Sequence, residues 1–120
     1  MVKILIVEDN EMNMCLFSDL LKTKGYEVSQ CSRGRAALKM IKKNHPDIVV
    51  MDIQMPEISG LELTKLIRKD RDIAHTKIVA VSAFAMKSDE ERILKAGCDA
   101  YISKPISIPV FFKTIEKFLP

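Results

Sequence analysis

The segment Ile48-Val49-Val50-Met51, followed at once by Asp52, indicates the fold of this chain. It is short, continuous and mostly β-branched, which is typical of a parallel β-strand that is buried on both faces. Two further runs, Ile4-Leu5-Ile6-Val7 and Ile78-Val79-Ala80-Val81, have the same character. Weaker strand patterns cover residues 27–31 and 100–103. These five runs are predicted to be the strands of one sheet.

Amphipathic patterns between the apolar runs predict five helices. We expect them at residues 10–24, 35–44, 59–69, 88–97 and 107–119. Gly25 and Gly97 are natural helix stops, and possible capping boxes begin at Ser59 and Ser88. The buried face of the first helix is expected to hold Asn13, Leu16, Phe17, Leu20 and Leu21. That of the last is expected to hold Ile108, Phe111, Phe112, Ile115, Phe118 and Leu119.

Alternation of strands and helices predicts an α/β fold, because parallel strands need crossover connections of about this length. We expect a doubly wound, five-stranded parallel sheet of the flavodoxin-like type, with strand order 2-1-3-4-5. The chain has 120 residues. That length suits one domain, over residues 1–120, and leaves no room for a second.

Composition excludes several functional classes. The 19 basic residues and 16 acidic residues leave a net charge of only +3, too weak a bias to predict nucleic-acid binding. The basic cluster around the second helix, which lacks aromatic neighbours, is read as a solvated face; it comprises Arg33, Arg35, Lys39, Lys42 and Lys43. Cys15, Cys31 and Cys98 have no metal-ligand spacing and are expected to be buried thiols in a reducing compartment. With no membrane-length apolar stretch or signal peptide, a cytoplasmic location is predicted.

Chemically active residues follow four of the predicted strands. Glu8 and Asp9 come after the first, Asp52 after the third, Ser82 after the fourth and Lys104 after the fifth. Each alone suits a turn, a helix cap or a solvated charge. Together they should meet, because ligands in such folds bind beyond the carboxyl ends of the strands. Crowded carboxylates need a cation, and an all-oxygen set favours Mg²⁺.

The motifs around these residues resemble the receiver domain of two-component response regulators. They are Val7-Glu8-Asp9-Asn10, Val50-Met51-Asp52-Ile53-Gln54-Met55-Pro56 with Gly60, Val81-Ser82-Ala83 and Tyr101-Ile102-Ser103-Lys104-Pro105. The resemblance spans essentially the whole chain, with every motif in order. Residues 8–13 and 83–92 are similar, within this family, to single-domain regulators of bacterial cell division and polarity.

The resemblance implies a role for each motif residue. Asp52 matches the phosphoryl acceptor, which receives its group from a phosphohistidine. Asp9, Asp52 and the backbone carbonyl of Gln54 would bind Mg²⁺ directly, or Mn²⁺ in its place, and Glu8 would act through the metal's waters. Lys104 would pair with phosphoryl oxygens, and the peptide bond before Pro105 would be cis. Asn10 is expected to cap the first helix.

The resemblance also implies a switch. Ser82 would hydrogen-bond the phosphoryl group, and its movement would free space for Tyr101. The surface reshaped by this change would include Phe84, Lys87, Arg92, Lys95, Tyr101, Ile106 and Val110. The expected partners are a histidine kinase or histidine phosphotransfer protein and a downstream target protein, for which a kinase is one candidate. The chain would be a phosphorylated signalling protein and not an enzyme acting on small substrates.

Alternative functions remain open at this stage. One is a receiver domain from a longer regulator with an output domain. Another is a flavodoxin-like binding module that is not phosphorylated, although Glu8 and Asp9 would repel a flavin phosphate. Gln54, where a phosphatase of the aspartyl-phosphate type would have a second acid, disfavours hydrolysis of external substrates. His45 and His75 fall in loops away from the carboxyl edge, which disfavours Ser/His/Asp catalysis.

Overall fold

A computed structural model describes residues 1–55, 57–83 and 87–120. The strands are β1 (Lys3–Val7), β2 (Glu27–Cys31), β3 (Ile48–Asp52), β4 (Lys77–Ser82) and β5 (Ala100–Ser103). The helices are α1 (Glu11–Thr23), α2 (Gly34–Asn44), α3 (Gly60–Lys69), α4 (Lys87–Lys95) and α5 (Ile108–Lys117). All strand pairs are parallel, in the order β2-β1-β3-β4-β5. The predicted doubly wound fold is confirmed.

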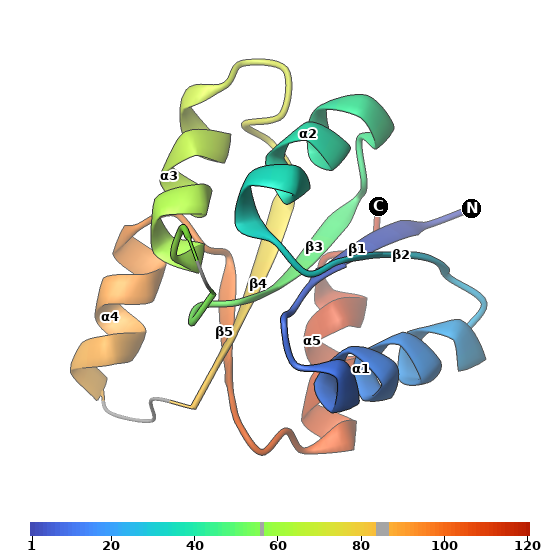
Figure 1. Ribbon diagram of the computed structural model, residues 1–120. Helices are drawn as coiled ribbons and strands as arrows, with labels where there is room; N and C mark the ends of the chain where they lie inside the picture. Colours follow the sequence, from blue (N-terminus) through green and yellow to red (C-terminus); the bar gives the residue numbers. More distant parts are fainter. Residues whose placement is uncertain (56, 84–86) are drawn as a thin grey trace.

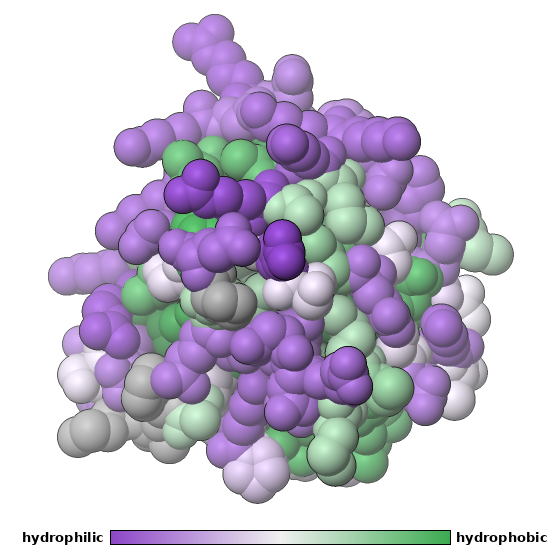
Figure 2. All heavy atoms as spheres, in the orientation of Figure 1, coloured by the Kyte–Doolittle hydropathy of each residue, from purple (hydrophilic) through white to green (hydrophobic). Residues whose placement is uncertain are grey.

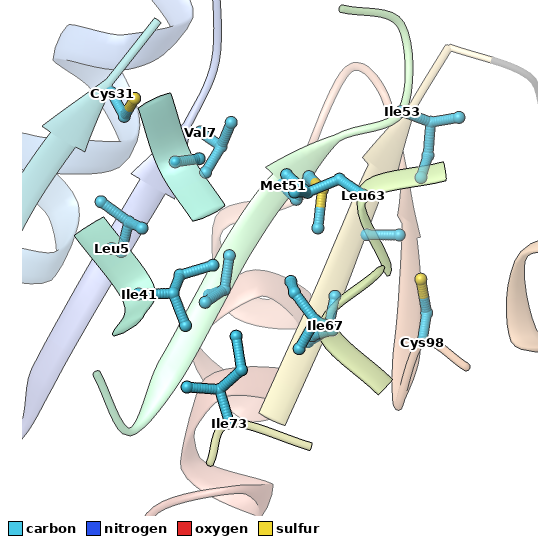
Figure 3. Packing of buried hydrophobic residues seen from close by; sticks show 14 of the residues in the cluster. Leu5, Val7, Cys31, Ile41, Met51, Ile53, Leu63, Ile67, Ile73 and Cys98 are labelled. Carbon is cyan, nitrogen blue, oxygen red and sulfur yellow. The ribbon is translucent and has the colours of Figure 1, made fainter. Parts of the chain in front are cut away.

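Helices cover both faces of the sheet (Figure 1). Along β3, Val49 and Met51 pack toward α2, α3 and α4, whereas Ile48 and Val50 pack toward α1 and α5. This alternation explains why β3 is apolar at successive positions, since each of its faces meets a helical layer. Figure 3 shows the first of these two cores, in which Ile41 of α2 and Ile67 of α3 approach the strands.

Predicted helix ends are largely confirmed. The Asn10 side chain accepts a hydrogen bond from the Asn13 N–H at 2.9 Å, and Ser59 caps α3 in the same way. Gly25 has a φ of +83°, the left-handed conformation that suits a glycine just after a helix. Ser88 was predicted to cap the fourth helix, and that prediction is wrong because the backbone is already helical at Lys87.

Three predictions about burial are also wrong. Leu16 is 40% exposed, because the buried stripe of α1 is formed by Met14, Phe17, Ser18 and Leu21. The hydroxyl of the buried Ser18 accepts a hydrogen bond from Gln30. Ile108 is exposed because α5 begins beyond the carboxyl ends of the strands. Cys15 lies on the outer side of α1 and is exposed, whereas the other two cysteines are buried as expected.

No helix in the part of the chain that the structure describes is long and apolar enough to span a membrane. His45 and His75 precede β3 and β4 and are exposed, so they lie at the amino edge of the sheet, as predicted. The predicted site residues lie at the opposite, carboxyl edge of the sheet.

Candidate functional site

The register of the central strands brings the predicted carboxylates together. Val7 pairs with Met51, so Glu8 and Asp52, the next residues on β1 and β3, reach the same level of the sheet. Carboxylate oxygens of Glu8, Asp9 and Asp52 all lie within 4.8 Å of one another. Glu8 and Asp52 are almost fully buried, whereas Asp9 is exposed. This arrangement confirms that the three acids converge at the carboxyl edge.

Lys104 reaches the acids from the other side. Its Nζ lies 2.9 Å from Glu8 Oε1 and 3.3 Å from Asp52 Oδ2. The backbone holds Lys104 in place, because its N–H donates to the Ser82 carbonyl at 2.8 Å and the bond to Pro105 is cis, as expected. An ammonium group at this position partly offsets the charge of the carboxylates.

Burial and mutual repulsion shape the electrostatics of the site. Burial raises the pKa of Glu8, and the neighbouring Asp52 carboxyl raises it further, against the opposing effect of Lys104. For Lys104, burial alone would lower the pKa, but the contacts with Glu8 and Asp52 outweigh it and raise the pKa. The lysine therefore stays charged, and one positive charge does not neutralise the acids.

The chain after β3 is held close to the acceptor carboxylate. The Gln54 N–H donates to Asp52 Oδ1 at 3.0 Å, so both oxygens of Asp52 have a donor. A Cβ on Gly60 would lie 2.8 Å from the Asp52 carbonyl oxygen and from the Ile53 Cα. Only glycine lets α3 begin this close to the end of β3, which explains the Gly60 of the motif.

Ser82 and Tyr101 occupy different surroundings. Ser82, the last residue of β4, is fully buried and follows Val81, which pairs with Asp52. Tyr101 pairs with Ala80, on the side of the sheet that α4 covers. Burial raises the pKa of Tyr101, as do two acids of α4, Asp89 and Glu90. The Tyr101 hydroxyl is buried and has no hydrogen-bond partner among the described residues.

One contact of the site was missed by the sequence reading. The Asn10 N–H donates to Glu8 Oε2 at 3.2 Å and so orients this carboxylate, while the Asn10 side chain caps α1. Nothing in the sequence signals it, because any residue but proline has an N–H. Asn10 thus ties the start of α1 to the acid cluster.

The donor set fits a divalent cation. Glu8, Asp9 and Asp52 offer only oxygen atoms, which Mg²⁺ prefers, and the exposed Asp9 leaves room for the waters that this ion retains. The net negative charge that Lys104 leaves uncompensated favours a cation. The predicted role of the Gln54 carbonyl as a further ligand stays a prediction.

We predict that millimolar Mg²⁺ raises the unfolding temperature, because an ion that binds only the folded state stabilises it by mass action. Near neutral pH, an ion at tenfold its Kd would add about 1.4 kcal/mol. Since burial raises the pKa of Glu8 above its ordinary value, the effect should weaken at a higher pH than it would for an exposed glutamate, as the Glu8 carboxylate is protonated. Differential scanning calorimetry from neutral to acidic pH measures the rise in unfolding temperature that Mg²⁺ causes. An equal shift in Asp9→Asn would contradict the shared site.

Comparisons with known proteins agree with this geometry. The family described as "Response regulator receiver domain" matches residues 4–116. The chain is 53% identical to the polar-differentiation response regulator DivK of Brucella ovis and to that of Brucella anthropi, over 97% of this chain and 94% of each relative.

Solved structures give the same result. The chemotaxis response regulator CheY4 of Vibrio cholerae superposes with a TM-score of 0.92 at 27% identity, over 99% of both chains. The receiver domain of a sensor histidine kinase from Pseudomonas aeruginosa, with a magnesium ion coordinated in its active-site cleft, superposes with a TM-score of 0.90 at 28% identity, over 98% of this chain and 96% of that one. Fold, site and sequence similarity agree, and this chain belongs to the response regulator receiver domain family.

Proposed function

We propose that this signalling protein accepts a phosphoryl group on Asp52 from a phosphohistidine of a histidine kinase or a histidine phosphotransfer protein. The observation that carries the proposal is the buried Asp52 carboxylate, which lies 3.3 Å from Lys104 Nζ and within 4.8 Å of two further acids. A carboxylate held in this way is a nucleophile with a cation beside it. Membership of the family supports two-component signalling, with a kinase as partner.

The transfer is a displacement at phosphorus. An Asp52 oxygen forms a bond to phosphorus, the bond from phosphorus to the histidine nitrogen breaks, and its electron pair returns to the imidazole. Lys104 contacts a phosphoryl oxygen, and the Gln54 N–H keeps the Asp52 carboxylate oriented. Asp9, Asp52 and the Gln54 carbonyl would hold Mg²⁺ or Mn²⁺, with Glu8 acting through water. When bound, the ion supplies positive charge that offsets the phosphoryl oxygens.

The direct test is labelling of the intact chain by a small phosphoramidate. We expect one phosphoryl group per chain in millimolar Mg²⁺ and none in excess chelator. The bond should be cleaved by hydroxylamine, as expected of an acyl phosphate, and mass spectrometry measures both steps. Labelling that persists in the chelator, or a product that resists hydroxylamine, would contradict the proposal.

Phosphorylation is proposed to act on a surface formed by α4, β5 and α5. Ser82 ends β4 close to Asp52, whereas Tyr101 faces α4 with a buried, unpartnered hydroxyl among the described residues. Movement of Ser82 toward a phosphoryl oxygen would let Tyr101 change position, which is a two-state equilibrium biased by a modification. Lys87, Arg92, Lys95 and Val110 are exposed on this surface, and Phe84 lies outside the described residues.

We predict that a kinase-type partner binds the phosphorylated or beryllofluoride-treated chain about tenfold more tightly, which corresponds to about 1.4 kcal/mol. Ser82→Ala and Tyr101→Ala should lose this difference, because each removes one moving side chain. Titration calorimetry with a purified candidate kinase measures it. Equal affinity for both forms of the wild-type chain would rule out the switch, since a ligand without preference shifts no equilibrium.

The biological setting is part of the same proposal. We propose a role in bacterial cell division or polarity, in the cytoplasm, with a kinase among the downstream targets. Similarity to the polar-differentiation response regulator DivK supports the polarity role. In this role the chain participates in its own phosphorylation without turning over an external substrate. A nucleic acid is not among the proposed partners.

A further inference from the structure

A surface groove lies between α2 and α3, away from the α4, β5 and α5 surface. We call it the α2–α3 groove. Its volume is about 520 Å³, and it is lined by Arg35, Leu38, Lys39, Lys42, Ile58, Leu63 and Leu66. Leu63 and Ile58 form a buried floor, and Leu66 is 42% exposed. In Figure 2, apolar surface is visible between hydrophilic side chains over this part of the molecule.

The cations of α2 form one rim of the α2–α3 groove. This helix carries four basic residues and no acidic one. Its positive charge is therefore larger than the net charge of the whole chain, which is +3. Lys42 is paired with Asp70 at 2.9 Å. Arg35 and Lys39 have no salt-bridge partner in the described part of the chain. The rim therefore offers two uncompensated positive charges beside an apolar floor.

The α2–α3 groove also reaches the segment that follows the acceptor. Ile58 lies six residues after Asp52, and a Cβ on Gly34 would overlap the Ile58 side chain. Arg33 and Glu57 approach to 4.0 Å at the same junction. The start of α2 therefore packs directly on the chain between β3 and α3. An occupant of the groove would touch a residue of that segment.

We propose that the α2–α3 groove docks an acidic amphipathic helix of a partner protein. The apolar side of that helix would cover Leu38 and Leu66, and its carboxylates would face Arg35 and Lys39, which is the usual pattern of helix-in-groove recognition. The groove follows helices of 11 and 10 residues, or about 16 Å, which accommodates about three helical turns. Nucleic acid would satisfy the cations but leave the apolar floor uncovered, so charge and shape together favour the acidic helix.

The probe is a fluorescent synthetic peptide of about 15 residues, with leucines at i, i+3, i+4 and i+7 and glutamates on the other face. Fluorescence anisotropy with the intact, unphosphorylated chain measures its affinity, expected to be on the order of 10 μM. Leu66→Ser and Lys39→Glu should each weaken binding at least tenfold. Matched controls away from the groove are Leu94→Ser, at an equally exposed leucine of α4, and Lys113→Glu on α5; both should bind as the wild type does.

Several outcomes would overturn the proposal. One is that a peptide with lysines in place of the glutamates binds with equal affinity. Another is that Leu66→Ser binds the acidic peptide as tightly as the wild type does, and a third is that the Leu94→Ser control binds it more weakly. If the chain instead bound a DNA duplex, with binding reduced in Lys39→Glu and unchanged in Leu66→Ser, that result would assign the cations to nucleic acid. Self-association lost in Leu66→Ser would assign the groove to a second copy.

The test is separate from that of phosphorylation. Asp52→Asn should bind the acidic peptide as the wild type does, because Asp52 does not line the α2–α3 groove. Conversely, Leu66→Ser should take up the phosphoryl group normally, which also shows that the variant is folded. Loss of labelling in Leu66→Ser together with loss of peptide binding would point to misfolding and count against the groove.

Discussion

The Asp52→Asn variant is expected to take up no phosphoryl group from a small phosphoramidate in millimolar Mg²⁺. The amide has nearly the shape of the carboxylate, but its oxygen is a far weaker nucleophile, so labelling should fall by at least ~100-fold. Mass spectrometry of the intact chain measures this loss. Glu8 and Asp9 lie near enough to compete as acceptors, and labelling that persists in Asp52→Asn would move the acceptor to one of them.

A matched control separates loss of the nucleophile from loss of a charge. Asp19 lies exposed on α1, so Asp19→Asn changes the net charge equally and should be labelled at the wild-type rate. Asp52→Asn must also unfold cooperatively, because only a folded variant tests the chemistry. If both variants lost labelling to the same degree, the effect would be one of net charge and Asp52 would have no special role.

The central part of the fold and most of the site were predictable from the sequence. A parallel strand buried on both faces must be apolar at each position, so Ile48–Met51 could be recognised without knowing its neighbours. Parallel strands end at a common edge, and the residues after them must therefore meet. This rule and the strand order together place Lys104 at the same edge as Glu8 and Asp52, and there the structure shows their contacts.

Details that depend on distant partners could not be predicted. The buried face of α1 includes Ser18, because Gln30 of β2 donates to its hydroxyl at 2.8 Å. An apolar pattern selects Leu16 instead, which is exposed. The orientation of Glu8 by the Asn10 N–H is likewise set by a backbone group that carries no sequence signal. The chemistry of the side chains could be predicted from the sequence, whereas hydrogen bonds to backbone groups could not.

Arg68 is the strongest case of such a hidden contact. Arg68 is the last residue but one of α3, and its guanidinium donates to three carbonyls, those of Gly97, Ala74 and Thr76. It also contacts Asp99 at 2.8 Å. These groups lie at the amino edge of the sheet, before β4 and β5, opposite the phosphorylation site. Arg68 therefore joins α3 to the two connections that lead into these strands.

The Arg68→Met variant is expected to lose about 3 kcal/mol of unfolding free energy, because partly buried carbonyls and the Asp99 carboxylate would lose their donors. The unfolding temperature should fall by about 10 °C. Urea denaturation of the metal-free chain measures the loss. Methionine keeps most of the apolar stem, so the change reports mainly on the hydrogen bonds.

Two further variants decide whether the guanidinium itself is responsible. Arg71→Met removes an exposed arginine from the connection between α3 and β4, and should change the unfolding free energy by less than about 0.5 kcal/mol. Arg68→Lys keeps the charge but cannot reach three carbonyls and Asp99 at once, so it should restore only part of the stability. If Arg68→Lys had the unfolding free energy of the wild type, the positive charge alone would account for the stabilisation. If Arg68→Met had it, the hydrogen bonds of Arg68 would contribute nothing. Labelling at Asp52 should persist in folded Arg68→Met, since the lost contacts lie at the opposite edge of the sheet.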